Sequence, residues 1–273
     1  MPKFFAADGT RIHFTDEGEG LPVLCLSGLT RNGTDFDYLA PYLTGIRHIR
    51  MDYRGRGQSD WADPASYAVP VEAGDALALL DHLGIDKAAI IGTSRGGIIA
   101  MFLALTAKDR LRGACLVDVG PVLNTEGLDT IKGYIGKNPV TKNLHDLARA
   151  RARMLHGFAN VPDSRWLEEA QKHYIETPDG ITINYDPQLA QVFNAANTGG
   201  DAWPMFDAMS GLPIALVRAA NSDLLTRETA HQMQTRRPDM IFVDVADRGH
   251  VPFLDEPEAV AAIQSWLDLV RKA

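Results

Sequence analysis

Cysteine is nearly absent from this sequence. Only Cys25 and Cys115 occur among its 273 residues, and each lies inside a short apolar run typical of a buried strand. This count excludes a fold held together by several disulfides and suits reduced thiols that pack as small core side chains. The eight histidines are scattered without the spacing of metal ligands, so the sequence predicts no metal site and no cofactor.

Long apolar runs near the start of the chain and an excess of basic charge are also missing. Residues 1–18 carry charged side chains every few positions, so neither a signal peptide nor a membrane span is visible there. The chain has 27 Lys and Arg against 35 Asp and Glu, a formal net charge of -8. Nucleic acids and anionic membrane surfaces bind basic surfaces, so neither is expected as the main partner. We expect a globular protein of the cytoplasm.

Short apolar strands alternate with helical segments along most of the chain. The expected strands cover residues 3–6, 11–15, 23–26, 46–51, 87–91, 113–117, 214–218 and 240–245. The expected helices between and after them cover residues 69–83, 96–106, 227–235 and 257–270. This alternation predicts an α/β fold with a mostly parallel central sheet flanked by helices.

The alternation is interrupted for about 80 residues after the sixth strand. Leu144–Leu155 and Trp166–Tyr174 have the spacing of amphipathic helices, Thr177–Asp186 reads as a turn with an extended segment, and another helix follows Pro187. These segments carry aromatic and apolar faces of their own, so they predict an inserted domain and not a linker. The expected division is a core of residues 1–120 and 205–273 with a mostly helical cap of residues 121–204.

One strand runs directly into a serine between glycines, in the stretch IIGTSRGG at Ile90–Gly97. Ser94 falls at a sharp turn between this strand and an apolar helix. At such a turn only very small side chains two positions before and after the serine avoid a clash, and Gly92 and Gly96 occupy these positions. The GxSxG spacing is that of a nucleophile elbow, so Ser94 is the candidate nucleophile.

A serine nucleophile needs a base to remove its proton and a carboxylate to orient that base. His250 and Asp223 follow the last two predicted strands, at the carboxyl edge where sites form in parallel sheets. Asp118 also follows a strand end, and Asp247 is close to His250 in sequence. The sequence therefore offers one base and more than one candidate acid.

The chain resembles the α/β-hydrolase family over nearly its whole length. The resemblance lies in the elbow, the segment RGRGQSD at Arg54–Asp60 and the order of Ser94, Asp223 and His250. The resemblance implies Asp223 as the preferred acid, while Asp118, where some relatives place the acid, more plausibly anchors the hinge of the cap. It also implies that the strand carrying Ser94 separates the two cysteines by roughly 10 Å, too far for a disulfide.

The family mechanism also requires two N–H donors aimed at the developing oxyanion. The resemblance assigns them to Arg95, at the helix start, and to Leu29 in the loop LSGLTRN, where Ser27 replaces the histidine of many relatives. Two interpretations of the Arg95 side chain stay open. In the preferred interpretation its guanidinium pairs with a carboxylate beneath the loops. In the other, it reaches the pocket and favours an acidic substrate with help from Arg31.

A cap over the nucleophile predicts a closed, largely apolar pocket for a small substrate. The aromatic residues of the insertion are candidates to line it, although most are expected to form the cap's own core: Trp166, Tyr174, Tyr185, Phe193, Trp203 and Phe206. The substrate contacts that we expect are Trp203, Val251, Leu224 and Arg31.

The resemblance implies a serine hydrolase that cleaves a small carboxylic ester or lactone through an acyl-enzyme. Cleavage of a carbon–carbon bond in a β-diketone or dienoic acid uses the same triad and is the enzymatic alternative. A ligand-binding protein on the same fold is the alternative from a different class. The expected partner is a small-molecule substrate, and a homodimer is a possible assembly.

Overall fold

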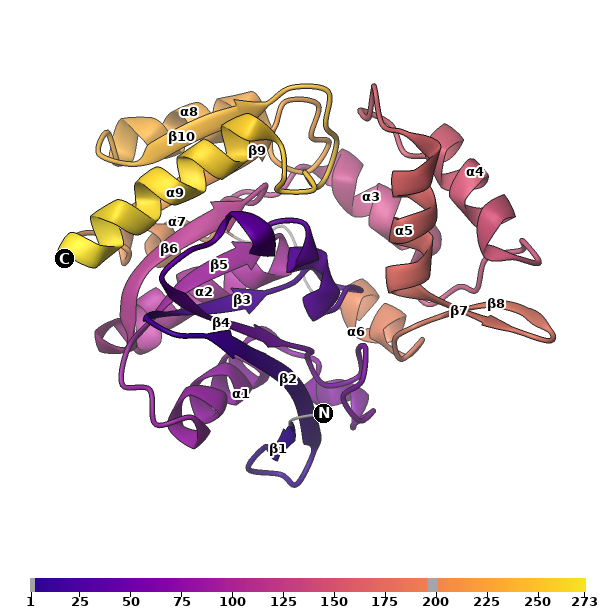
Figure 1. The fold of residues 1–273 in the computed structure, drawn as a ribbon, viewed down its shortest axis with the longest axis horizontal. Helices are drawn as coiled ribbons and strands as arrows, with labels where there is room; N and C mark the ends of the chain where they lie inside the picture. The colour runs from indigo at the N-terminus through magenta and orange to yellow at the C-terminus, as the bar shows by residue number, and fades with distance from the viewer. Residues whose placement is uncertain (1–2, 196–200) are drawn as a thin grey trace.

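An eight-stranded sheet runs through the molecule and carries helices on both faces (Figure 1). The computed structural model describes residues 3–195 and 201–273. The strand order is β1-β2-β4-β3-β5-β6-β9-β10, and all neighbours pair in parallel except β1–β2 and β2–β4. The strands are β1 (Lys3–Phe5), β2 (Arg11–Gly18), β3 (Leu21–Leu26), β4 (Ile46–Met51), β5 (Ala88–Thr93), β6 (Leu111–Val117), β9 (Ile214–Ala219) and β10 (Ile241–Val245). The predicted fold class is confirmed.

The alternation of side chains along each strand builds two apolar layers. Leu24 and Ile90 point into the layer covered by α1, α2, α7 and α8, whereas Val23 and Ile91 point into the layer under α9 and the 3-10 helix η1. Because β5 is buried on both faces, its sequence is apolar without alternation. The elements of these layers are α1 (Val69–His82), α2 (Arg95–Thr106), α7 (Trp203–Asp207), α8 (Arg227–Arg236), α9 (Pro257–Lys272) and η1 (Gly33–Asp37).

The two cysteines lie in the layer under α9, on strands separated by β5. Cys25 of β3 is level with Ile91 of β5, and Ile91 is level with Cys115 of β6. Both thiols are free and fully buried. Burial raises the pKa of each thiol, so both stay protonated as core side chains.

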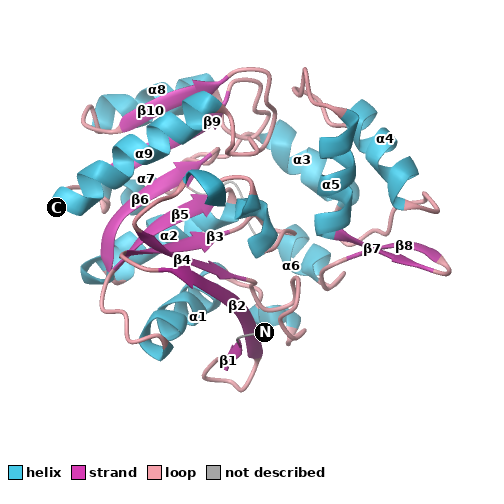
Figure 2. Ribbon diagram, in the orientation of Figure 1, coloured by secondary structure: helices cyan, strands magenta, loops and turns pink. Residues whose placement is uncertain are grey.

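The insertion between β6 and β9 is mostly helical, with one small hairpin (Figure 2). Its elements are α3 (Thr125–Tyr134), α4 (Leu144–Met154), α5 (Asp163–His173), β7 (Tyr174–Thr177), β8 (Gly180–Ile183) and α6 (Leu189–Ala195). Trp166 and Leu147 belong to an apolar cluster formed within the insertion by α4, α5 and the hairpin. These aromatic and apolar faces therefore form a core of the insertion, as the spacing predicts.

The insertion is fixed to the sheet domain through the loop after β4. The Gly57 N–H donates to the Asn184 carbonyl at 3.0 Å, and the Asp186 N–H donates to the Gly55 carbonyl at 2.8 Å. The Tyr67 hydroxyl donates to the Asp186 carboxylate at 2.6 Å. A short backbone ladder thus joins the end of the hairpin to the RGRGQSD segment.

Candidate active site

Ser94 stands at the turn between β5 and α2 with a strained backbone, φ 51° and ψ -110°. The glycines beside it are required by close approach. A Cβ on Gly96 would lie 2.0 Å from the Leu26 carbonyl oxygen, and one on Gly92 would lie 2.5 Å from the backbone of Gly96. Any larger residue at either position would push the helix away from the strands. The elbow geometry predicted from GxSxG is confirmed.

The His250 ring lies between Ser94 and a carboxylate. Its Nε2 is 2.9 Å from the Ser94 Oγ, and its Nδ1 is 2.7 Å from Oδ2 of Asp118. A carboxylate only accepts hydrogen bonds, so Nδ1 donates to Asp118 and Nε2 is left to accept from the serine hydroxyl. The second oxygen, Oδ1 of Asp118, accepts the Ala219 N–H at 2.9 Å. Asp118 is fully buried, and this pair of contacts fixes its carboxylate plane.

Asp223 does not reach His250, and the expectation that it is the acid is corrected in favour of Asp118. The Asp223 carboxylate accepts from the Thr130 hydroxyl at 3.2 Å, and its carbonyl accepts from the Gly127 N–H at 3.1 Å. Both partners belong to α3 of the insertion. The physical reason is that these contacts hold the loop after β9 against α3, whereas Asp118, directly after β6, lies within hydrogen-bond distance of His250.

Of the two residues expected to supply oxyanion donors, Arg95 directly follows Ser94, and Leu29 directly follows Gly28, where a Cβ would lie 3.9 Å from Cβ of Ser94. The Arg95 N–H opens α2, and the Leu29 N–H lies in the loop after β3. Within residues 3–195 and 201–273 neither N–H donates a hydrogen bond to the protein. Two free donors beside the nucleophile match the requirement for an oxyanion site.

Ser27 ties the loop after β3 to the elbow through its backbone. Its carbonyl accepts the Gly96 N–H at 3.1 Å and the Tyr53 hydroxyl at 3.2 Å. The side chain at this position makes no hydrogen bond to the described residues. The loop is therefore held without the histidine that many relatives carry here.

A buried ion cluster supports both oxyanion donors from below. Arg56 donates from Nε to the Leu29 carbonyl at 2.9 Å and forms an ion pair with Glu72 at 2.9 Å. Arg95 donates from Nε to the other oxygen of Glu72 at 2.6 Å and from Nη2 to the Tyr67 carbonyl at 3.1 Å. Glu72 is fully buried. The preferred interpretation of the Arg95 side chain is confirmed, because its guanidinium is occupied beneath the loops.

Arg56 and Glu72 were not among the expected site residues, although the sequence holds a signal for them. Glu72 shares one helical face with Ala76 and Leu79, which are both buried. An acid on the apolar face of a helix requires a buried cation. The arginines of RGRGQSD were the available candidates, and Arg56 is the one that pairs with Glu72.

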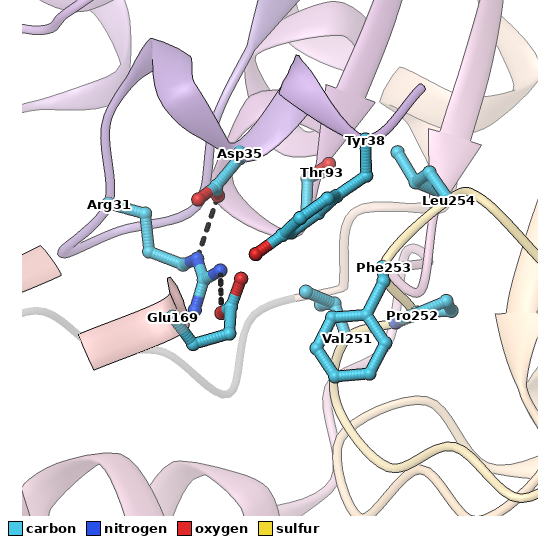
Figure 3. A pocket seen from close by; sticks show the side chains of 9 residues that line it. All are labelled: Arg31, Asp35, Tyr38, Thr93, Glu169, Val251, Pro252, Phe253 and Leu254. Atoms are coloured by element: carbon cyan, nitrogen blue, oxygen red, sulfur yellow. Dashed lines mark hydrogen bonds and ion pairs between the residues drawn. The ribbon is translucent and has the colours of Figure 1, made fainter. Parts of the chain in front are cut away.

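A small charged pocket is lined in part by Thr93 and Val251, the residues directly before Ser94 and after His250 (Figure 3). Arg31 donates from Nε to Asp35 at 2.7 Å and from a terminal nitrogen to Glu169 of α5 at 2.8 Å. His173 of α5 places Nε2 3.1 Å from the second oxygen of Asp35. We call this site the charged pocket, and its lining residues are Arg31, Asp35, Tyr38, Thr93, Glu169, Val251, Pro252, Phe253 and Leu254.

The carboxyls of the charged pocket are ionised. Burial disfavours the charged form of Asp35 and Glu169, but Arg31 between them outweighs it, and the pKa of each carboxyl lies below its usual range. Burial raises the pKa of Tyr38, so its hydroxyl stays protonated. Two carboxylates thus pair with Arg31, so its guanidinium is not free to bind an acidic substrate.

Two of the four expected substrate contacts line the charged pocket, namely Arg31 and Val251. The Trp203 ring instead packs edge-on against Phe206 at 5.7 Å between centroids, under the guanidinium of Arg236. Leu224 packs on α3, where its carbonyl accepts the N–H of Asn124 at 2.9 Å. Trp203 therefore packs on α7 and α8 of the sheet domain, and Leu224 helps to seat the insertion.

Two further features, a group of metal ligands and a membrane-spanning helix, are absent from the part of the chain that the structure describes. Among the residues with described placement, no three His, Cys, Asp or Glu side chains group as metal ligands would. In the same part of the chain, no helix combines the length and apolar character needed to cross a membrane.

Comparisons with known proteins agree with this fold. The model of the Alpha/beta hydrolase family matches residues 23–263. A 3-hydroxybutyrate-oligomer hydrolase of Cupriavidus necator is 36% identical over 251 residues, which cover 88% of this chain and 85% of that protein. A 2-(acetamidomethylene)succinate hydrolase of Mesorhizobium japonicum is 24% identical over 94% of this chain and 91% of its own.

A solved structure is also similar over almost the full length. The crystal structure of an alpha/beta hydrolase from Novosphingobium aromaticivorans superposes with a TM-score of 0.91 at 37% identity, covering 98% of this chain and 97% of its own. Sequence and structure thus agree over both the sheet domain and the insertion. The chain belongs to the alpha/beta hydrolase family.

Proposed function

We propose that this hydrolase is a serine esterase that cleaves short esters of hydroxyacids, such as 3-hydroxybutyrate oligomers, through an acyl-enzyme. The observation that carries the chemistry is the hydrogen-bonded series from Ser94 through His250 to Asp118. The substrate class is supported by the 36% identity to a 3-hydroxybutyrate-oligomer hydrolase over most of both chains. Residues 121–204 act as the cap over this site.

The geometry supports each step of an acyl transfer. His250 takes the proton from the Ser94 hydroxyl as Oγ attacks the ester carbonyl, and Asp118 stabilises the imidazolium that forms. The N–H groups of Leu29 and Arg95 receive the oxyanion, a contribution of roughly 3 to 4 kcal/mol per donor in comparable sites. His250 then returns the proton to the leaving alcohol. In the second half, His250 deprotonates water, which attacks the acyl carbon and releases the acid and Ser94.

The ester proposal is tested by pre-steady-state release of p-nitrophenol from p-nitrophenyl butyrate and by mass spectrometry of a linear 3-hydroxybutyrate trimer. The wild type should show a burst of one equivalent per enzyme and shorten the trimer. Ser94→Ala should lose both, with turnover falling by something on the order of 10⁶. Ser265→Ala, on the exposed face of α9, is the matched control and should behave as the wild type.

Two results would reject the proposal. A wild-type enzyme that is inert on all esters but cleaves a β-diketone or dienoic acid would be a carbon–carbon hydrolase with the same triad. Turnover of the p-nitrophenyl ester without any cleavage of the trimer would retain the acyl-enzyme and remove the hydroxyacid substrate class.

A further inference from the structure

We propose that the charged pocket is a subsite that binds the free hydroxyl group of a 3-hydroxyacyl substrate; this deepens, and rests on, the function proposed above. Two lining residues of the pocket are chain neighbours of the triad. Thr93 directly precedes Ser94, and Val251 directly follows His250. The proposal therefore places a group bound in this pocket on the same side of the site as the nucleophile and the base.

Gly28 leaves the way from the nucleophile to the pocket open. A Cβ at this position would lie 3.4 Å from Cδ of Arg31 and 3.9 Å from Cβ of Ser94. The side chains of Arg31 and Ser94 thus both lie close to Gly28, and residue 28 has no side chain to occupy the space beside them. A substrate acylated on Ser94 can reach the pocket within a few bonds of its carbonyl carbon.

The pocket accepts one small group. Its cavity volume is about 10 Å³, which is close to the least space that holds a single water molecule. Pro252, Phe253 and Leu254 close one side of it, and α5 of the cap closes another through Glu169. A hydroxyl group fits this space, whereas a carboxylate or a further acyl unit does not.

The charge of the pocket selects against an anion. One arginine, Arg31, faces two ionised carboxylates, Asp35 and Glu169, so the cluster carries one net negative charge when His173 is neutral. Both hydrogen-bonding contacts that Arg31 makes in the pocket end on these carboxylates. A substrate carboxylate placed here would meet like charge without a free cation to pair with.

The unused hydrogen-bonding groups of the pocket match a hydroxyl. Oε1 of Glu169 is a buried acceptor without a hydrogen-bond partner among the described residues, whereas Oδ1 of Asp35 faces Nε2 of His173 at 3.1 Å. The hydroxyls of Tyr38 and Thr93 are equally unpartnered within that part of the chain. Figure 3 shows the Tyr38 hydroxyl directed into the space between Arg31 and Val251. A bound hydroxyl can donate to a carboxylate and accept from Tyr38, which satisfies both kinds of group at once.

This assignment predicts that the enzyme removes units from the hydroxyl end of an oligomer. A linear hydroxyacid oligomer has a free hydroxyl at one end and a carboxylate at the other, and only the hydroxyl end suits the charged pocket. Ser94 then forms its acyl bond to the hydroxyl-terminal unit while that unit's ester C–O bond breaks. The proton held by His250 passes to the alcohol oxygen of the shortened oligomer, and water later releases the single 3-hydroxyacid.

The test compares two esters that share a leaving group, p-nitrophenyl 3-hydroxybutyrate and p-nitrophenyl butyrate, each corrected for its rate of hydrolysis by hydroxide. The wild type should show a kcat/KM about tenfold higher on the hydroxy ester, the worth of one hydrogen bond to a charged group. On a 3-hydroxybutyrate trimer, methylation of the terminal hydroxyl to an ether should lower kcat/KM by a similar factor. Methylation of the terminal carboxylate should not lower it.

The variant Tyr38→Phe removes a donor from the pocket and keeps the ring. It should bring the ratio of kcat/KM between the two p-nitrophenyl esters close to one. Tyr42→Phe is the matched control, since Tyr42 is 43% exposed on the surface; it should preserve the ratio. A change that merely loosened the fold would lower the rates on both esters together and leave their ratio intact.

Three outcomes would overturn the subsite. They are equal wild-type kcat/KM on the two esters, a ratio that survives in Tyr38→Phe, and a trimer whose carboxylate rather than hydroxyl must be free. Failure of the ester function itself has a different signature, because neither p-nitrophenyl ester would then give a burst.

Discussion

The choice between Asp118 and Asp223 as the acid of the triad can be decided by replacing each with asparagine. In Asp118→Asn the amide oxygen can still accept the Ala219 N–H, which in the wild type donates to Oδ1 of Asp118 at 2.9 Å. The amide nitrogen then faces Nδ1 of His250 and forces the proton onto Nε2, which can no longer accept from the Ser94 hydroxyl. This tautomer error costs a factor of about 10⁴ in kcat in a comparable triad, or about 5 kcal/mol of transition-state stabilisation.

Asp223→Asn is the matched control, because an amide oxygen can keep the 3.2 Å contact with the Thr130 hydroxyl. Its kcat should stay within about twofold of the wild type. The assay is steady-state and burst hydrolysis of p-nitrophenyl butyrate, with thermal unfolding of both variants to establish that each is folded. A large loss of kcat in Asp223→Asn beside a nearly normal Asp118→Asn would refute the triad as the structure arranges it.

Two further predictions concern buried charges. Glu72→Gln leaves Arg56 and Arg95 uncompensated beneath the oxyanion donors. It should therefore lower the free energy of unfolding by roughly 3 kcal/mol in urea titrations and reduce kcat more than it raises KM. Unchanged stability and kcat would contradict this. Burial, with Arg50 nearby, lowers the pKa of His48 to about 4, so stability should be complete above about pH 6.5 and fall by about 3 kcal/mol as the pH drops towards 4. His48→Leu should flatten this slope in unfolding titrations at several pH values, and an unaltered slope would show that other groups cause it.

The parts of the fold that depend on residues close together in the chain could be predicted from the sequence. The elbow at Ser94 depends on a strand, two glycines and a helix that are contiguous in the chain, and it was predicted with its base, His250. The insertion could be predicted because its helices have amphipathic spacing and interrupt a regular alternation. The two oxyanion donors stay a prediction from position, because a backbone N–H does not depend on the side chain.

The acid of the triad could not be fixed in this way, because Asp118 and Asp223 both stand just beyond a parallel strand. Which carboxylate meets His250 depends on the lateral order of β6 and β9 and on loop conformation. Ser222 illustrates this, since its hydroxyl accepts two N–H groups of the following turn and thereby shapes the loop that holds Asp223 against α3. Strand order and loop conformation both depend on contacts between residues that are far apart in the sequence.

The charged pocket was beyond prediction for a similar reason. Arg31 and Asp35 come from the loop after β3, whereas Glu169 and His173 come from one helix of the cap. In sequence each half looks like an ordinary solvated charge pattern. Only the docking of α5 on η1 brings the halves together and removes them from water.

The position of Asp118 bears on when the enzyme becomes active during synthesis. Ser94 and Asp118 belong to a single unit of β5, α2 and β6, with Ser94 between β5 and α2 and Asp118 directly after β6, and this unit leaves the ribosome before any of the insertion does. The base arrives last, because His250 follows β10, the final strand to join the sheet. A nascent chain can therefore hold its nucleophile and acid in place while lacking the base that joins them, and hydrolysis must await the C-terminal edge of the sheet.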